Sequence, residues 1–334
     1  MEKYNIKNNT IQKLTNNGKG ILAADESINT MGRRLNLIQL ENTYQNRTKW
    51  RTLISETNDL EKYISGIILC EETLRTHING KPIINRFIDK DILVGIKVDL
   101  GLDQLSGTVN EKITKGLDDL RERCIEYYEL GARFTKWRVV FDISETNPSE
   151  ICIDHNLNSL ARYAAISQDC GLIPIIEPEI LMDGTHDIHK SNEVTREILT
   201  RTYSKLSKHK VKLEHSLLKP NMIRPGSRNN DLSEIPTKII ANNTIYALQN
   251  TVPFLVPGIM FLSGGMSEKF ATIVLNDISK SELIKPWYIS FSFGRALQQS
   301  ALLEWKGIND NLAKKKLIEM CKNNCLALKG EFNL

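Results

Sequence analysis

The sequence predicts an α/β fold: a single (β/α)8 TIM barrel with extra N- and C-terminal helices. Short apolar runs alternate with amphipathic segments along nearly the whole chain, in eight repeats, which is the pattern of a parallel sheet covered by helices. No Gly-X-Gly-X-X-Gly turn or phosphate-binding P-loop follows any run, and this disfavours a doubly wound open sheet. No Gly-, Ser- or Pro-rich linker divides the chain. Residues 1–334 are therefore expected to form one domain.

Each expected strand is a short apolar run, as a parallel strand buried on both faces requires. In chain order the strands are residues 20–25, 66–70, 94–99, 133–140, 172–177, 213–219, 258–263 and 287–291. Amphipathic helices are expected between them at residues 115–130, 156–170, 193–208, 234–249 and 266–277. Two more helices, at roughly residues 3–17 and 309–327, lie outside the eight repeats.

Charge and composition exclude several functional classes. The 334 residues carry a net charge of only +4, which argues against a nucleic-acid partner. No apolar run approaches the roughly 18 residues of a membrane helix, and the polar N-terminus lacks a secretion signal. A cytoplasmic location with no membrane partner is expected. The six cysteines show no paired spacing, and Cys321 with Cys325 lacks the second ligand pair of a zinc site.

Charged and hydroxyl-bearing residues collect at the carboxyl ends of the expected strands. Because barrel strands are buried on both faces, charges within them need a function or a partner. In this fold the carboxyl ends of the strands form the rim on which active sites are built. The residues concerned are Asp25, Lys97, Lys136, Arg138, Glu177, Lys219 and Ser263, with Arg295 just after the last strand.

Lys219 stands in the apolar run Leu217-Leu218-Lys219-Pro220-Asn221-Met222. Removing an ammonium group from water disfavours its charged form, and repulsion from Lys97 and Lys136 is expected to act in the same direction. A neutral lysine amine attacks a carbonyl carbon and gives a Schiff base. Taken alone, Lys219 also fits a lysine that snorkels at the rim of a strand.

A Schiff base on a ketone withdraws electrons, and it thereby permits retro-aldol cleavage of a carbon–carbon bond. The reaction needs an acid for the departing carbinolamine water and a base for the hydroxyl proton. Glu177 and Asp25 are the carboxylates that can supply these roles at the rim.

Two further clusters are typical of anion sites. The turn Ser263-Gly264-Gly265 and the pair Gly294-Arg295 form the first, since backbone N–H groups at a helix start can cradle a phosphate. The second cluster consists of Ser27, Thr30, Arg33 and Arg34. Each piece alone also fits a solvated turn or a helix cap, but two anion sites flanking a reactive lysine indicate a substrate phosphorylated at both ends.

Seven segments, in order from residue 19 onward, closely resemble the class I fructose-bisphosphate aldolases, the metal-independent, Schiff-base type. They are KGILAADES (19–27), GIKVD (95–99), KWR (136–138), EPEIL (177–181), LLKPNM (217–222), FLSGG (261–265) and SFGRALQ (292–298). The resemblance covers nearly the whole chain, and several of the segments are long and specific.

The resemblance implies roles for the matched residues. Lys219 would form the Schiff base, Glu177 would be the acid and base of carbinolamine formation and dehydration, and Asp25 the base at the C4 hydroxyl. Lys136 and Glu179 would support Glu177. The implied C1-phosphate ligands are Ser263, Gly264, Gly294 and Arg295; the implied C6-phosphate ligands are Ser27, Thr30, Arg33, Arg34 and Lys97, with Arg138 near the same cavity.

The implied reaction is reversible cleavage of fructose 1,6-bisphosphate to dihydroxyacetone phosphate and glyceraldehyde 3-phosphate, in glycolysis and gluconeogenesis. No cofactor and no metal are expected. The resemblance also implies a homo-oligomer, usually a homotetramer.

The chain departs from the family pattern in places. Thr30 replaces a serine, Arg33 and Leu100 each replace a lysine, and Met266 replaces a glutamine. The C-terminal tail of the family, which ends in a tyrosine that assists proton exchange on the enamine, is absent after about residue 330. An active enzyme with slowed or altered turnover is the expectation.

Three alternatives stay open at this stage. The first is an aldolase for another ketose phosphate, such as fructose 1-phosphate or sedoheptulose 1,7-bisphosphate. The second is a non-catalytic sugar-phosphate-binding scaffold, although binding alone does not require Lys219, Glu177 and Asp25 together. The third is a zinc-dependent aldolase, for which His186 and His189 are the candidate ligands.

Overall fold

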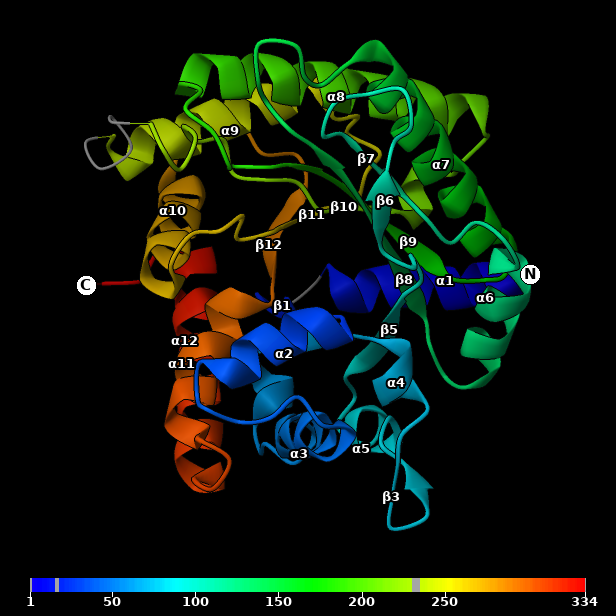
Figure 1. Ribbon diagram of the computed structural model, residues 1–334, viewed down its shortest axis with the longest axis vertical. Helices are drawn as coiled ribbons and strands as arrows, with labels where there is room; N and C mark the ends of the chain where they lie inside the picture. The colour runs from blue at the N-terminus through cyan, green and yellow to red at the C-terminus, as the bar shows by residue number, and fades with distance from the viewer. Residues whose placement is uncertain (1, 16–17, 230–234, 334) are drawn as a thin grey trace.

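In the computed structural model, which describes residues 2–15, 18–229 and 235–333, eight parallel strands close into a barrel. Around the barrel the order is β1-β12-β11-β10-β9-β8-β5-β2; Figure 1 labels most of these strands. The strands are β1 (Gly20–Ala24), β2 (Ile64–Leu69), β5 (Leu93–Lys97), β8 (Phe134–Phe141), β9 (Ile173–Ile180), β10 (Leu217–Leu218), β11 (Gly258–Phe261) and β12 (Tyr288–Phe293). The predicted fold class is confirmed.

One strand is much shorter than the sequence indicates. Residues 213–219 were expected to be extended, but Leu213–His215 forms a 3-10 turn and β10 keeps only two residues. The Ser216 hydroxyl donates to the Leu213 carbonyl at 2.8 Å and stabilises the turn. The polar residues 214–216 form hydrogen bonds within this turn instead of with a neighbouring strand. The apolar strand therefore begins only two residues before Lys219.

The long helices form the outer layer, and consecutive helices from α7 to α12 pack side by side (Figure 1). The bounds are α1 (Glu2–Leu14), α2 (Ile28–Asn36), α3 (Tyr44–Ser55), α4 (Glu71–Leu74), α5 (Asn85–Ile88), α6 (Leu120–Glu129), α7 (Glu150–Asp169), α8 (Ile188–Lys208), α9 (Thr237–Thr251), α10 (Glu268–Lys280), α11 (Arg295–Trp305) and α12 (Asp310–Leu328).

The predicted helices are present with shifted ends. Ser149, Asp187 and Ser267 each accept a backbone N–H at the start of α7, α8 and α10, which are capping interactions that fix where a helix begins. Helix α6 starts at Leu120 rather than 115, because Asp119 adopts a left-handed conformation, with φ of 53°. Residues 16–17 and Glu234, which the sequence also places in helices, lie outside the described residues.

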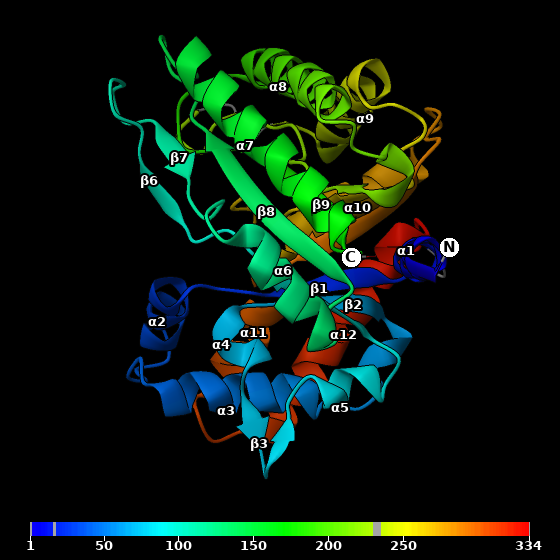
Figure 2. The ribbon, with the colours of Figure 1, turned by 90° about the vertical axis from the view of Figure 1, so that its right-hand side faces the viewer.

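Several elements were not expected from the sequence. They are helices α2 to α5 and α11, and two short hairpins, β3 (His77–Ile78) with β4 (Lys81–Pro82) and β6 (Leu102–Gln104) with β7 (Lys112–Thr114). Helix α2 begins where Ser27 accepts the backbone N–H of Thr30. It lies at the opposite end of the barrel from α1 (Figure 2).

An apolar plug fills the bottom of the barrel. Ile11 and Leu14 of α1 pack with inward side chains of the strands, which are Ile21, Ala23, Ile68, Phe134, Ile173, Ile175, Leu217 and Met260. The Phe134 ring needs the glycine at position 95, since a Cβ there would lie 2.2 Å from Phe134 Cε2. The interior is therefore closed at the amino ends of the strands, and any substrate must enter from the other end.

A second, larger core lies between the strands and the helices. On β8, Trp137 points outward and stacks on Tyr163 of α7 with ring centroids 5.4 Å apart. Because side chains alternate along a strand, the neighbours of Trp137, Lys136 and Arg138, point into the barrel. In the described part of the chain, no helix is long and apolar enough to cross a membrane.

Candidate active site

Four charged side chains cap the apolar plug at the carboxyl end of the barrel. On each strand the charged residue follows an inward apolar residue at a spacing of two: Asp25 follows Ala23, Lys136 follows Phe134, Glu177 follows Ile175 and Lys219 follows Leu217. Parallel pairing aligns Lys136 with Ile175 and Arg138 with Glu177. Strand periodicity and barrel register therefore bring these residues to one level.

Lys136 lies at the centre of this cluster. Its Nζ is 2.8 Å from Asp25 Oδ2, 3.3 Å from Glu177 Oε2 and 4.0 Å from Asp99 Oδ2. Lys219 Nζ lies 3.2 Å from Glu177 Oε1 on the other side. Lys136, Glu177 and Lys219 are each only 4% exposed. A chain of alternating charges thus runs from Asp25 through Lys136 and Glu177 to Lys219.

The electrostatics of the cluster keep Asp25 ionised. Burial alone would raise the pKa of Asp25, but the positive charges of Lys136 and Lys219 hold it well below its usual range. Burial would likewise lower the pKa of Lys136, and the carboxylates of Asp25, Glu177 and Asp99 raise it instead. Asp25 is therefore an anion at neutral pH, as a general base must be.

A cavity of about 630 Å³ opens above the cluster. Its lining joins the four charged residues to most of the predicted anion ligands. These are Thr30, Arg33, Arg34, Ser263, Gly264, Gly294 and Arg295, and Glu179 and Gly265 also line the cavity. The structure thus gathers residues from positions 23 to 299 around one space of the size of a small-molecule site.

The two anion clusters face the cavity from neighbouring elements. Met266 N donates to Ser263 O at 2.9 Å and closes the Ser263-Gly264-Gly265 turn, in which both glycines have positive φ. Arg295, the first residue of α11, reaches back and donates to Met266 O at 3.2 Å. In α2, Arg33 donates to the Thr30 hydroxyl at 3.4 Å.

Three predicted substrate ligands do not line the cavity. Lys97 Nζ pairs instead with Asp99, 2.6 Å from its Oδ1, and Arg138 forms an ion pair with Glu179 through its Nε. Ser27 is occupied as the N-cap of α2, where its hydroxyl accepts Thr30 N at 3.2 Å. The substrate roles of these three residues stay predictions.

Sequence reasoning missed a buried carboxylate next to Asp25. Glu26 forms ion pairs with Arg34 and Arg51 and accepts a hydrogen bond of 2.9 Å from Gln298 Nε2. Burial would raise the pKa of Glu26, but the two guanidinium groups lower it. Glu26 therefore fixes Arg34 at the cavity wall. The sequence feature that could have revealed Glu26 is its position directly after Asp25, a candidate catalytic residue.

Asp99 and Asn221 were also missed. Asp99 is 5% exposed and accepts Arg138 N at 3.4 Å, in addition to its ion pair with Lys97. The Asn221 side chain accepts Ile180 N at 2.7 Å and donates to Ile180 O at 2.8 Å. This two-point contact replaces a missing strand pairing after β10, and it holds the segment that carries Lys219.

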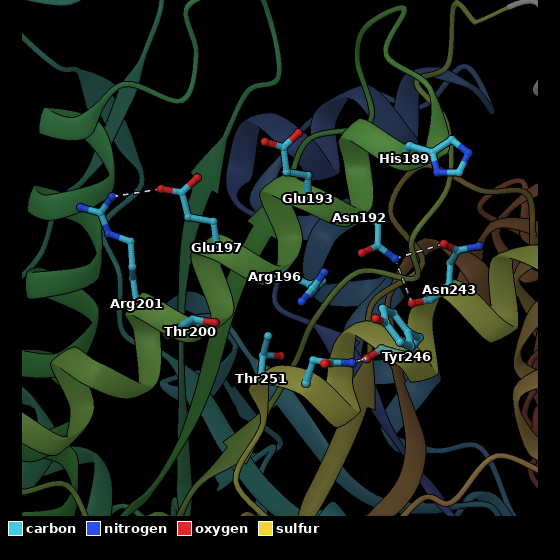
Figure 3. A pocket seen from close by; sticks show the side chains of 11 residues that line it. His189, Asn192, Glu193, Arg196, Glu197, Thr200, Arg201, Asn243, Tyr246 and Thr251 are labelled. Atoms are coloured by element: carbon cyan, nitrogen blue, oxygen red, sulfur yellow. Dashed lines mark hydrogen bonds and ion pairs between the residues drawn. The ribbon is translucent and has the colours of Figure 1, made fainter.

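A second cavity, of about 610 Å³, lies at the surface between α8 and α9 (Figure 3). Its charged groups already have partners: Arg196 lies over the Tyr246 ring with 5.5 Å to the centroid, and Arg201 pairs with Glu197 at 3.1 Å. None of the residues expected to form the Schiff base, transfer protons or bind phosphate lines it. The residues that line this cavity give no reason to place a catalytic site there.

His189 opens onto that second cavity (Figure 3), while His186 lies in the loop before α8. Within residues 2–15, 18–229 and 235–333, no three His, Cys, Asp or Glu side chains are grouped to hold a metal ion. Cys321 and Cys325 are buried in α12.

Comparisons with known proteins agree with this geometry. Residues 7–334 match the family model of class I (glycolytic) fructose-bisphosphate aldolase. The chain is 48% identical over 326 residues to fructose-bisphosphate aldolase 5, cytosolic, of Arabidopsis thaliana, covering 97% of this chain and 90% of the relative. It is 48% identical to the cytoplasmic isozyme of Spinacia oleracea, covering 94% of this chain and 88% of the relative.

A solved structure agrees as well. The fold matches a fructose-bisphosphate aldolase from Plasmodium falciparum, crystallised with TRAP and a small-molecule inhibitor, with a TM-score of 0.96. The two chains are 43% identical, and the match covers 100% of this chain and 96% of the other. With a closed barrel, a buried lysine–carboxylate cluster and relatives of this similarity, the chain belongs to the class I fructose-bisphosphate aldolases, lyases of glycolysis.

Proposed function

We propose that Lys219 carries the aldolase reaction by forming a Schiff base with the C2 carbonyl of fructose 1,6-bisphosphate. The observation that carries this assignment is the position of Lys219 Nζ, 3.2 Å from Glu177 Oε1 on the wall of the main cavity. An amine beside a carboxylate can lose a proton to it before attacking the carbonyl carbon. The product of the attack is a carbinolamine.

Glu177 then acts as the acid of dehydration. Its Oε2 is buried and has no hydrogen-bond partner among the described residues, although Lys136 Nζ lies 3.3 Å away. The ion pair is close but poorly directed for a hydrogen bond, so the Glu177 carboxyl group can return the proton that it took from Lys219 to the carbinolamine hydroxyl. Water leaves and the protonated Schiff base of Lys219 remains.

Asp25 is the base of carbon–carbon cleavage. Its carboxylate lies across Lys136 from Glu177, with 2.8 Å between Lys136 Nζ and Oδ2. When Asp25 takes the proton of the C4 hydroxyl, the C4 oxygen forms a carbonyl, the C3–C4 bond breaks and its electrons move to the iminium nitrogen. Glyceraldehyde 3-phosphate departs, and protonation of the enamine at C3 followed by hydrolysis releases dihydroxyacetone phosphate.

The phosphates are assigned to the two anion clusters. The C1 phosphate lies against Ser263, Gly264, Gly294 and Arg295, and the C6 phosphate against Thr30, Arg33 and Arg34, with Ser27, Lys97 and Arg138 nearby. Guanidinium groups suit this task because their fork matches phosphate oxygens. Glu179 supports the site by holding Arg138.

Trapping of the Schiff base tests the lysine. With dihydroxyacetone phosphate and borohydride, the iminium is reduced to a stable secondary amine, and peptide mass mapping locates the adduct. We expect it on Lys219, and Lys219→Met should lose both the adduct and cleavage while keeping its thermal transition. An adduct on another lysine, or none in the wild type, contradicts the assignment.

Residues 1–334 are proposed to act as one barrel domain in a homotetramer, as the family resemblance implies. Sedimentation equilibrium of the purified chain gives the assembled mass, and a monomer or dimer at micromolar concentration contradicts the tetramer.

A further inference from the structure

An arginine that the mechanism does not use lies beside the active site. Arg224 follows Lys219 by five positions and is only 7% exposed. Its Nε is buried and has no hydrogen-bond partner among the described residues, and Asp183 is the one carboxylate whose charge acts on it. A buried and unpaired guanidinium is costly, since arginine is almost never buried without a partner.

The open space next to Arg224 lies at Gly265. A Cβ placed on Gly265 would lie 3.8 Å from Arg224 Nη2 and 3.8 Å from Arg295 Nη2. Apart from the adjacent residues of the chain, no other atom of the described residues would lie within 4 Å of it. Two guanidinium nitrogens thus flank one empty position at the Ser263-Gly264-Gly265 turn. Two nitrogens at this distance from a common point are close enough for a single phosphate to contact both.

The charges around this space are unbalanced. Burial lowers the pKa of Arg224, the positive charge of Arg295 lowers it further, and the charge of Asp183 opposes them more weakly. The pKa of Arg295 is lowered in the same way, by burial first and by the charge of Arg34 second, and the charge of Glu268 opposes them more weakly. Arg34 has Glu26 as a partner. At both arginines burial and a neighbouring guanidinium outweigh the nearby carboxylate, so a bound anion would offset the remaining positive charge.

Arg224 is also held in place. Ile223 N donates to the Thr244 hydroxyl at 2.8 Å, and Gly226 N donates to His186 O at 2.8 Å. The backbone on both sides of Arg224 is thus attached to neighbouring elements. Because this backbone is held before a ligand arrives, ordering it costs no further conformational entropy on binding.

We propose that Arg224 is a second guanidinium ligand of the phosphate held by the Ser263-Gly264-Gly265 turn and Arg295. The inference rests on the proposed function, because it takes the phosphate to be that of the triose portion joined to Lys219. Arg224 contacts the phosphate oxygens across the space above Gly265, and Arg295 contacts them from the other side. The site thereby favours ketones that carry a phosphate at this end.

The test compares two ketones that react with the same lysine. Dihydroxyacetone phosphate carries the phosphate and dihydroxyacetone lacks it, and borohydride trapping at Lys219 reports the occupancy of either ketone. Arg224→Met removes the charge and keeps the length of the side chain, and Arg224→Lys restores a charge without the fork. Arg196→Met, an exposed arginine of the second cavity, is the matched control.

For Arg224→Met we expect the half-saturating concentration of dihydroxyacetone phosphate to rise about 10- to 100-fold. This is the loss of affinity expected when one or two charge-assisted hydrogen bonds are removed. The concentration for dihydroxyacetone should stay unchanged, and Arg224→Lys should recover part of the loss. Arg196→Met should behave as the wild type.

Two results would overturn the inference. The first is a half-saturating concentration of dihydroxyacetone phosphate that Arg224→Met leaves unchanged. The second is an equal rise of the half-saturating concentration for both ketones, which indicates a structural role for Arg224. A wild type that traps neither ketone contradicts the Schiff-base assignment itself, and the inference about Arg224 falls with it.

Discussion

Lys219 Nζ and Glu177 Oε1 are 3.2 Å apart, and the other oxygen of the same carboxylate lies 3.3 Å from Lys136 Nζ. One carboxylate therefore lies between two buried ammonium groups, and each of the three side chains is 4% exposed. The arrangement lets Glu177 exchange a proton with Lys219 or with the carbinolamine oxygen, while Lys136 keeps Asp25 ionised.

Glu177→Gln should lower kcat for fructose 1,6-bisphosphate cleavage about 10²- to 10⁴-fold, the usual effect of losing a general acid. The amide cannot donate the proton that releases water from the carbinolamine. Steady-state cleavage and the rate of borohydride trapping measure the effect together, and both should fall. Glu150→Gln, at a carboxylate with 81% of its side chain exposed, is the control. Retention of more than a tenth of the activity contradicts the role.

Asp25→Asn should separate Schiff-base formation from bond cleavage. Without a base for the C4 hydroxyl, cleavage should fall about 10²- to 10⁴-fold. Dihydroxyacetone phosphate has no C4, so its adduct on Lys219 should still form. Stopped-flow trapping and a coupled cleavage assay test the two steps. Equal loss of both steps would assign Asp25 to the first step instead.

Glu26→Gln should lower the free energy of unfolding at pH 7 by about 3–5 kcal/mol, because Arg34 and Arg51 lose a buried partner. The pKa of Glu26 is depressed in the folded state from an ordinary value of 4.5. Its stabilisation is therefore complete above about pH 4.5 and is lost as pH falls through the folded-state pKa. Urea unfolding should show the gap between wild type and variant narrowing below pH 4.5.

The matched control for Glu26 is Glu71→Gln. Glu71 forms an ion pair with Arg75 in which both side chains are more than 40% exposed, so the loss should be below about 1 kcal/mol. If the difference in free energy of unfolding between the wild type and Glu26→Gln does not change with pH, the carboxylate stabilises the fold by packing rather than by charge.

Gly95→Ala should destabilise the barrel by about 1–3 kcal/mol, the usual cost of overpacking. The new methyl group would lie 2.2 Å from Phe134 Cε2. In a double-mutant cycle, Phe134→Leu should remove most of this penalty, because the two residues are in contact. Additive losses measured by chemical denaturation would contradict the clash.

Cys70 should react first with a thiol reagent at pH 8. It is half-buried, whereas the other five cysteines are buried. Burial raises the pKa of Cys152 and of Cys325 to about 12, so their thiolates are scarce at that pH. Mass mapping after brief alkylation should find one label, and Cys70→Ser should remove it. Early labelling of Cys152 would show that α7 opens locally.

The order of the barrel strands, and the placement of the candidate catalytic residues at their carboxyl ends, could be predicted from the sequence because both depend on local patterns. The alternation of apolar runs and amphipathic segments predicts the barrel, and the spacing of two between Phe134 and Lys136 sets the inward side of β8. The short β10 was misjudged, because the apolar run does not show that Ser216 closes a turn on Leu213. Helices α4 and α5 have only four residues each, too few to show a helical period, and α2, α3 and α11 were missed although α2 is strongly amphipathic.

The sequence by itself determined the fold class and which residues stand at the rim, since strand period and motif spacing are properties of neighbouring positions. Only the tertiary structure decided the partners: Lys97 with Asp99, Arg138 with Glu179, and Glu26 with Arg34 and Arg51. It also placed Arg224 beside Arg295, 71 positions away in the numbering. Such pairs depend on barrel register and on which buried charge finds a counter-charge, and no local pattern encodes either.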